Sequence, residues 1–495
     1  MKKTIHYYYL FIVIFGGMIV ISSCNNKKDA PEKPNILFLF ADDQRAGTIH
    51  VLGNSEIITP NLDKLTEEGI VFPNAYIMGG SSAAVCAPSR AMLMTGRNLY
   101  SIEKQGWRAD ISGKYETMPE TFRKAGYITY GIGKQHNGRS VYARGFSDGD
   151  EIFFGGMYDH WNIPLYHFDT TGRYDKKLPY CPAWDRSNKL KYRNADHIVS
   201  GTHSCELFSD AAISFLNNYD GKRPFFMYVS YTTPHDPRTM PERFRKMYDT
   251  ASVSVPSNFL PQHPFDQGDY YIRDEKLAKF PRSRPEIKQQ IIDYYAMITY
   301  LDEEIGRIID VLKKRGLYEN TIVVFSGDNG LAVGQHGLMG KQNLYECSVN
   351  VPLIFSGKGI PVNKKCNTPV YLFDIYPSLC DMAGTEASSS VQGRSFKDFM
   401  LNDESDDQKV MFYGYKEYQR AVRSGNFKLI EYYVDNQRHT QLFDLSNDRM
   451  EINNIAGKTR YKPVLDSLQH ILFNSRISLN DTGSFWQGYK KYIGK

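Results

Sequence analysis

The chain has 495 residues, of which 41% are hydrophobic and 23% are charged. This balance is typical of soluble globular proteins and excludes a collagen, a disordered chain and a membrane protein with many spans. Lys and Arg together number 60 and Asp and Glu 55, a small excess for this length, and no dense basic stripe accompanies it. We therefore expect no nucleic-acid partner, whereas an anionic substrate is compatible with the charge.

The first 23 residues have the pattern of a bacterial lipoprotein signal peptide. Two lysines follow Met1, an apolar segment runs from Leu10 to Ile21, and two serines lead to Cys24. This apolar segment is too short for a comfortable membrane span. Cys24 resembles the lipidated cysteine of bacterial lipoproteins, and an ordinary cleaved signal peptide is the alternative. The first interpretation predicts a lipid anchor at Cys24, a polar tether over residues 24–33 and a place at the cell envelope, facing the periplasm or the cell surface.

Two kinds of hydrophobic pattern alternate along residues 34–401. Continuous apolar runs predict strands that are buried on both faces, and apolar residues every three or four positions predict amphipathic helices. The expected elements, in chain order, are a strand over residues 36–40, helices over 59–69 and 121–125, strands over 127–132 and 225–230, a helix over 291–312 and a strand over 321–325. This alternation predicts an α/β fold with a large, doubly wound, mostly parallel sheet flanked by helices.

Two regions depart from this alternation. Over residues 138–218 the periodicity fades and Gly, aromatic and His residues accumulate, so we expect an insertion on the substrate side of the α/β domain. An acidic, loop-like run at residues 402–408 then marks a boundary. Beyond it, the pattern indicates antiparallel strands and a helix at residues 420–433, 441–445 and 463–473. We therefore expect a smaller C-terminal α+β subdomain over residues 402–495.

Polar side chains follow four of the predicted strands, where a doubly wound sheet binds its ligands. Four of them offer only oxygen ligands, namely Asp42, Asp43, Asp328 and Asn329. This set suits a hard cation such as Ca²⁺ or Mg²⁺, although an Asp-Asp pair after a strand is more commonly a turn or a helix cap. Further cations and proton carriers are Arg90, Lys134, His136, His235 and Lys341. A divalent cation beside fixed positive groups would bind a tetrahedral oxyanion.

Residues 86–97 identify a family. They read Cys-Ala-Pro-Ser-Arg-Ala-Met-Leu-Met-Thr-Gly-Arg, and they resemble the C-x-P-S-R-x-x-x-x-T-G-R signature of the type I sulfatases at every fixed position. Other segments similar to this alkaline-phosphatase-like family follow in order at residues 133–136, 233–237, 328–330 and 340–341. The resemblance extends over residues 34–456 and implies a bacterial carbohydrate sulfatase.

The resemblance also implies roles for the matching residues. A sulfatase-maturing enzyme would convert Cys86 to formylglycine, which hydrates to a geminal diol. One hydroxyl of the diol would attack sulfur, and the second would allow sulfate to be expelled afterwards. The implied Ca²⁺ ligands are Asp42, Asp43, Asp328 and Asn329. The implied catalytic residues are Cys86, Arg90, His136, which acts on the diol, and His235, which faces the leaving-group oxygen. Lys134 and Lys341 would bind the sulfate.

Residues outside this shared set are candidates for contact with a sugar. Aromatic faces and hydrogen-bonding side chains suit a sugar ring, and the candidates are His336, His160, Trp161, Asp185 and Arg186. For His336 the alternative is a role in ordering its own loop, and for each of the others it is a structural role. The expected substrate is an O-sulfate on a sugar of a mucin-type glycan or glycosaminoglycan.

Two other functions stay open. Some phosphodiester and phosphonate monoester hydrolases of the same superfamily also use the C-x-P-S-R segment, although the single set of oxygen ligands differs from the His-rich two-metal set of many phosphatases. An inactive glycan-binding lipoprotein would be expected to lack Cys86, Lys134 or His235, and all three are present.

The remaining cysteines give one weak structural hint. Five are left after Cys24 and Cys86, so they cannot all pair within the chain, and their spacings match no zinc pattern. A disulfide between Cys181 and Cys205 is the candidate pairing.

Overall fold

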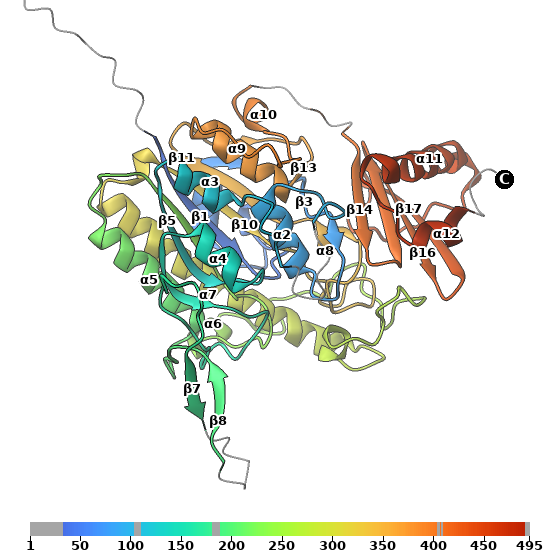
Figure 1. The fold of residues 1–495 in the computed structure, drawn as a ribbon. Helices are drawn as coiled ribbons and strands as arrows, with labels where there is room; N and C mark the ends of the chain where they lie inside the picture. Colours follow the sequence, from blue (N-terminus) through green and yellow to red (C-terminus); the bar gives the residue numbers. More distant parts are fainter. Residues whose placement is uncertain (1–32, 103–109, 181–188, 403–405, 407–408, 491–495) are drawn as a thin grey trace, which may run out of the picture. The chain divides into compact units, whose positions relative to one another are not determined.

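The computed structural model describes residues 33–102, 110–180, 189–402, 406 and 409–490 (Figure 1). The predicted signal peptide, Cys24 and the tether up to residue 32 lie outside the described residues, and so do Cys181, Asp185 and Arg186. No helix in the described part of the chain is both long enough and apolar enough to cross a membrane.

An eight-stranded sheet forms the centre of the fold, in the order β12-β2-β11-β10-β1-β9-β5-β6. Its strands are β1 (Asn35–Ala41), β2 (Gly69–Val71), β5 (Ile128–Lys134), β6 (Asp148–Phe153), β9 (Phe225–Ser230), β10 (Thr321–Gly327), β11 (Leu353–Gly357) and β12 (Lys364–Lys365). Strand β1 is parallel to both neighbours, β10 and β9, whereas β11 is antiparallel to β10 and β2. The large, mostly parallel sheet predicted from the sequence is thereby confirmed.

Helices cover both faces of this sheet (Figure 1). Alternate residues of β1 enter two hydrophobic clusters, with Phe38 and Phe40 in one and Leu37 and Leu39 in the other. The first cluster includes residues of α2 (Cys86–Thr95), α3 (Met118–Lys124), α4 (Arg139–Gly145) and α9 (Ile375–Met382). The second includes residues of α1 (Pro60–Glu67), α5 (Ser204–Asn218), α6 (Glu242–Arg245) and α7 (Arg284–Lys314). A strand buried on both faces explains why the sequence of β1 is continuously apolar.

Residues 138–218 are only partly an insertion, contrary to the expectation. Helix α4, strand β6 and helix α5 all belong to the α/β layers, since β6 pairs with β5 and α5 packs against α7. The hairpin of β7 (Lys177–Tyr180) and β8 (Lys191–Asn194) lies between them in the chain. The pattern hid β6 because this edge strand begins with the polar residues Asp148-Gly149-Asp150-Glu151.

The C-terminal α+β part is built on an antiparallel sheet, as predicted. Its strands are β14 (Met411–Tyr415), β15 (Gln419–Ser424), β16 (Phe427–Val434) and β17 (Gln437–Asp444), and α11 (Lys462–Ser478) packs on β15 and β16. The other short elements are β3 (Ala75–Tyr76), β13 (Val370–Tyr371), α8 (Glu346–Val349), α10 (Lys397–Leu401) and α12 (Phe485–Tyr489).

A fifth strand of this sheet comes from far earlier in the chain. Strand β4 (Gly79–Gly80) pairs in parallel with β14. Gly79 has a φ of +100°, and a Cβ atom there would lie 2.1 Å from the carbonyl oxygen of Gly414, so only glycine fits. Because β4 precedes α2, this pairing ties the segment that leads to Cys86 to the C-terminal sheet. Residues 34–495 accordingly form one compact unit.

The candidate disulfide is wrong. Cys205 is a free thiol at the start of α5, and its side chain is fully buried. Burial raises the pKa of this thiol well above its usual value.

Candidate active site

The carboxyl ends of four adjacent strands bring the predicted polar residues together. Ala41 of β1 lies beside Gly327 of β10, and Gly133 of β5 lies beside Ser230 of β9. The chain beyond each strand is also tied to its neighbours, since the Asp42 amide donates to the Thr233 carbonyl (3.0 Å) and the Asp328 amide donates to the Ala41 carbonyl (3.1 Å). The site therefore follows from the sheet topology.

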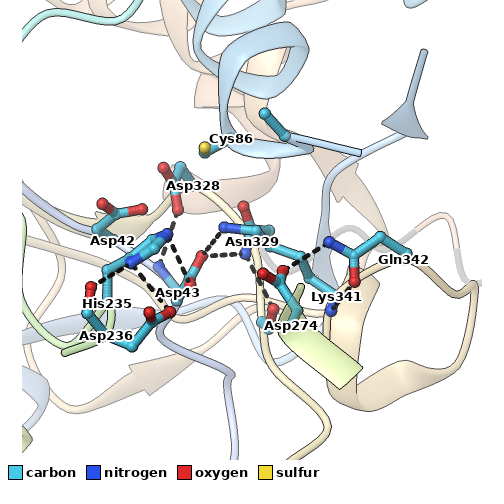
Figure 2. A network of polar contacts seen from close by, with 12 residues as sticks. Asp42, Asp43, Cys86, His235, Asp236, Asp274, Asp328, Asn329, Lys341 and Gln342 are labelled. Atoms are coloured by element: carbon cyan, nitrogen blue, oxygen red, sulfur yellow. Dashed lines mark hydrogen bonds and ion pairs between the residues drawn. The ribbon is translucent and has the colours of Figure 1, made fainter. Parts of the chain in front are cut away.

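Three buried carboxylates form the centre of the site, with Asn329 beside them (Figure 2). Single ligand atoms of Asp42, Asp43 and His235 lie within 4.8 Å of one another, and so do those of Asp42, Asp328 and Cys86. Asp42 Oδ1 and Asn329 Oδ1 are buried and accept no hydrogen bond from the described residues. These crowded oxygens fit a hard divalent cation.

The surroundings shift the pKa values of two of these carboxylates in opposite directions. Burial, and next the charge of Asp328, raise the pKa of Asp42 to about 6. Burial also acts to raise the pKa of Asp43, but Lys341 and His235 outweigh it and hold this pKa below its usual range. Crowded carboxylates of this kind are stabilised by added positive charge.

Two lysines provide part of that positive charge. Lys134 Nζ lies 2.5 Å from Asp42 Oδ2, and Lys341 Nζ lies 2.5 Å from Asp43 Oδ1. Both ammonium groups are buried. The pKa of Lys341 is well above its usual value, because the charge of Asp43 outweighs the opposing effect of burial. Lys341 therefore remains charged beside Asp43.

Cys86 is the first residue of α2, and only 2% of it is exposed. Its Sγ lies 3.4 Å from His136 Nδ1. Burial raises the pKa of the Cys86 thiol, and burial together with Lys134 lowers the pKa of His136 well below its usual value. The unmodified thiol is therefore neutral near pH 7 and a weak nucleophile.

Arg90 lies one helical turn after Cys86 and is buried behind the carboxylates. Its Nε donates to Asp328 Oδ2 at 2.8 Å, and its Nη1 donates to Ser230 Oγ. The guanidinium carbon lies 5.0 Å from the centre of the Phe40 ring. Arg90 thus fixes the position of Asp328 relative to β9 and to α2.

His235 follows β9 and points its ring toward the carboxylates (Figure 2). Its Nε2 lies 3.6 Å from Asp43 Oδ2, and its Nδ1 lies 2.8 Å from the carbonyl oxygen of Asp236. The His235 residue is 4% exposed. One nitrogen is therefore bound to the backbone and the other faces the site.

The structure gives two of the predicted sugar-binding residues other surroundings. His160 is buried, with its Nε2 3.0 Å from the His235 carbonyl oxygen and its Nδ1 2.9 Å from Ser204 Oγ. The ring of His336 stacks on Tyr345 at 3.7 Å and contacts Asn258. These contacts favour the structural alternative for both residues, in which His160 supports the backbone at His235 and His336 orders its loop. Trp161 is half-buried and meets the ring of His203 edge-on.

Sequence reasoning missed a second group of polar residues beside the site. Asp236, Arg273, Asp274 and Gln342 form a chain of contacts that runs from His235 to Lys341. Asp236 could have been noticed as the neighbour of His235, whereas Arg273 and Asp274 lie in an irregular region with no pattern.

Comparison with known protein families agrees with the residues that the structure brings together at this site. A family model described as Sulfatase matches residues 34–385, more than half of the chain. The chain belongs to the sulfatase family. It is a sulfuric ester hydrolase, and this activity accounts for the cationic and acidic residues at one sheet edge. A second model, described as N-sulphoglucosamine sulphohydrolase, C-terminal, matches residues 334–478.

Individual relatives cover nearly the whole chain. The chain is 26% identical to an N-acetylglucosamine-6-O-sulfatase of Bacteroides thetaiotaomicron, over 92% of this chain and 88% of the relative. A solved structure of a protein with its substrate D-glucosamine-2-N,6-O-disulfate is 24% identical, with a TM-score of 0.73 over 92% of this chain and 99% of that one. The phosphonate monoester hydrolase of Agrobacterium radiobacter has the same fold, with a TM-score of 0.69 and 19% identity over 90% of this chain and 96% of that one.

Proposed function

We propose that this sulfatase removes an O-sulfate from a sugar of a sulfated glycan, of the mucin or glycosaminoglycan type, through a formylglycine made from Cys86 and one Ca²⁺. The observation that carries the proposal is the convergence of three buried carboxylates, two buried lysines and Cys86 at one sheet edge. A thiol whose pKa is raised by burial has little use as a nucleophile, which favours its conversion to another group.

The first sugar to test is a glucosamine derivative with a sulfate at O6. The relative named N-acetylglucosamine-6-O-sulfatase aligns over 92% of this chain, and the substrate in the similar structure carries both N- and O-sulfates. A panel of defined sulfated monosaccharides and disaccharides, read by sulfate release, would identify the sugar and the hydroxyl. Loss of activity in Cys86→Ala on the same panel would tie the activity to this site.

The metal proposal rests on the ligand set. Asp42, Asp43, Asp328 and Asn329 would hold the ion, because two of their oxygens are buried without hydrogen bonds among the described residues. A bound Ca²⁺ supplies positive charge that lowers the pKa of a hydroxyl beside it and offsets the charge of the sulfate.

The chain's own residues divide the remaining work. Lys134 and Lys341 bind the sulfate oxygens, and Arg90 holds Asp328 in place. His136 lies beside Sγ of Cys86 and accepts a proton from the group made there. His235 donates a proton from Nε2 to the sugar oxygen as the S–O bond breaks.

The same fold also serves a phosphonate monoester hydrolase, so phosphate and phosphonate esters belong in the panel. Rates of sulfate and phosphate release from matched esters would decide between the two activities. A protein that binds sulfated glycans and releases neither ion would instead be a glycan-binding lipoprotein.

The N-terminal segment completes the proposal. Cys24 would carry the lipid anchor and residues 24–33 would serve as a tether, which places the enzyme at the bacterial cell envelope. Metabolic labelling with a fatty-acid probe should mark the wild-type protein, and Cys24→Ala should abolish both the label and membrane fractionation.

A further inference from the structure

The hydrogen bonds of His235 show that Nδ1 of the ring carries a proton. Nδ1 lies 2.8 Å from the carbonyl oxygen of Asp236 and 3.3 Å from Oδ1 of the same residue. Both partners are acceptors, so Nδ1 must donate. The other nitrogen, Nε2, is left to face Asp43 and the acidic centre (Figure 2). Asp236 therefore holds a proton on Nδ1 and sets the direction of the ring.

Asp236 is itself held by an arginine. Arg273 Nη2 lies 3.1 Å from Asp236 Oδ1, and Nη1 contacts Oδ2, so the guanidinium binds the carboxylate in a bidentate manner. Such a two-point contact fixes the plane of the carboxylate as well as its position. The side chain of Asp236 is 12% exposed and that of Arg273 is 46% exposed, so the pair lies at the outer side of the site.

The same arginine connects His235 to a sulfate-binding lysine. Arg273 Nη2 lies 2.6 Å from Asp274 Oδ1, and Asp274 Oδ2 accepts a hydrogen bond from Gln342 Nε2 at 2.6 Å. Gln342 Oε1 in turn accepts from the Lys341 amide at 3.0 Å. A continuous polar network thus joins the two residues that the proposed function assigns to the leaving group and to the sulfate.

We propose that Asp236 and Arg273 are positioning residues for His235. Asp236 accepts the Nδ1–H of His235 and so holds the ring with Nε2 toward the leaving-group oxygen. The proton on Nε2 is the one transferred to that oxygen, the proton on Nδ1 stays on the ring, and Arg273 keeps Asp236 in place. This inference rests on the proposed function, because the rate gain from positioning His235 comes from protonation of a sugar oxygen. The competing role is purely structural, in which the pair only ties the region around Arg273 to the end of β9.

A double-mutant cycle separates the two roles. Asp236→Ala, His235→Ala and the double variant are assayed on a sugar sulfate and on an activated aryl sulfate. Loss of a hydrogen-bond partner that orients a functional histidine typically costs about 10–100-fold, so Asp236→Ala should lose roughly that much kcat on the sugar sulfate and little on the aryl sulfate. The double variant should be no slower than His235→Ala, because Asp236 acts only through the ring. Multiplied losses in the double variant would overturn the inference.

Two further variants distinguish a local defect at His235 from misfolding of the protein. Asp236→Asn keeps an acceptor for Nδ1 and should recover much of the loss, and Arg273→Gln should show a weaker form of the Asp236→Ala defect. Asp269→Ala is the matched control: this carboxylate is 11% exposed and pairs with Lys416 at 2.6 Å, in contact with the C-terminal sheet. Asp269→Ala should leave the ratio of kcat on the sugar sulfate to kcat on the aryl sulfate unchanged. An equal shift of this ratio in the control would refute a specific role for Asp236.

A spectroscopic readout does not depend on activity. In protein labelled with ¹⁵N-histidine, the His235 signals, assigned by their loss in His235→Ala, should show a proton on Nδ1. Asp236→Ala keeps the backbone carbonyl but loses the carboxylate, and it should lower the fraction of rings protonated at Nδ1. A wild-type ring with no proton on Nδ1 would refute the inference. A wild-type enzyme that releases no sulfate from any ester would instead refute the proposed function, while the protonation of Nδ1 could still be measured.

Discussion

Replacement of His235 by Ala tests the assignment of the leaving-group acid. The substitution removes the nitrogen that lies 3.6 Å from Asp43 Oδ2. The contacts of Lys134 with Asp42 and of Lys341 with Asp43 do not involve His235, so these residues stay in place. The expected effect is therefore a defect in proton donation, with the nucleophile and the metal ligands retained.

The size of the effect depends on the leaving group. A sugar alkoxide is a poor leaving group, so the sugar sulfate should lose about 10²–10⁴-fold in kcat/KM, the usual contribution of a general acid. At 1.36 kcal/mol for each factor of ten, this is about 2.7–5.4 kcal/mol of transition-state stabilisation. A nitrophenolate leaves without a proton, so a nitrophenyl sulfate should lose less than about tenfold.

The assay measures kcat/KM for both substrates in the wild-type protein and in His235→Ala, after thermal denaturation has shown that the variant is folded. The ratio of the two losses isolates proton donation, since all other steps are shared. Equal losses on the two esters would contradict the assignment and would mean that His235 binds sulfate or holds the fold.

Three further outcomes are expected. Cys86→Ser, in protein whose serine has not been converted to formylglycine, should accumulate one sulfate on that serine and stop, because serine lacks the second hydroxyl. Multiple turnovers by protein whose mass confirms an unmodified serine would contradict this. Chelation should remove activity and Ca²⁺ should restore it and raise Tm, because the ion offsets crowded carboxylates; full activity in metal-free protein would refute the metal assignment. Asp481→Asn should destabilise the fold by about 3–5 kcal/mol, because it breaks the buried pair with Arg420. Burial acts to raise the pKa of Asp481, but Arg420 outweighs it and lowers this pKa. The stability that the pair contributes is therefore present above the unfolded pKa of about 3.9 and is lost as pH falls through the folded pKa. Urea denaturation at pH 7 and pH 3 should show a smaller difference in unfolding free energy between wild type and variant at the lower pH.

The sequence was most informative where one local pattern determines the structure. The apolar runs that became β1, β9 and β10 are buried on both faces, and runs as short as these favour a buried strand over a buried helix. Once these strands are parallel neighbours, the residues that follow them must meet at one edge. The grouping of Asp42, Asp328 and His235 could therefore be predicted from the order of apolar and polar residues alone.

Residues whose role depends on packing could not be assigned in this way. A histidine in an aromatic-rich segment suggests a sugar contact, but His160 is turned inward by Ser204 and by the backbone of His235. Arg273 belongs to the site only because the chain between α6 and α7 returns to the end of β9. The pairing of β4 with β14 is similarly hidden, since two glycines carry no strand pattern.

The charge balance of the site explains why its ligands should bind together. The carboxylates of Asp42, Asp43 and Asp328 are paired with Lys134, Lys341 and Arg90, so these six buried groups carry no net charge. A divalent cation bound among the carboxylates leaves an excess of positive charge in a region of low dielectric, where uncompensated charge is costly. An anionic sulfate ester removes part of that excess, and the two lysines are the groups available to meet its oxygens. Cation binding and sulfate binding at this site are therefore expected to strengthen each other, and each should raise the affinity of the other by the same factor.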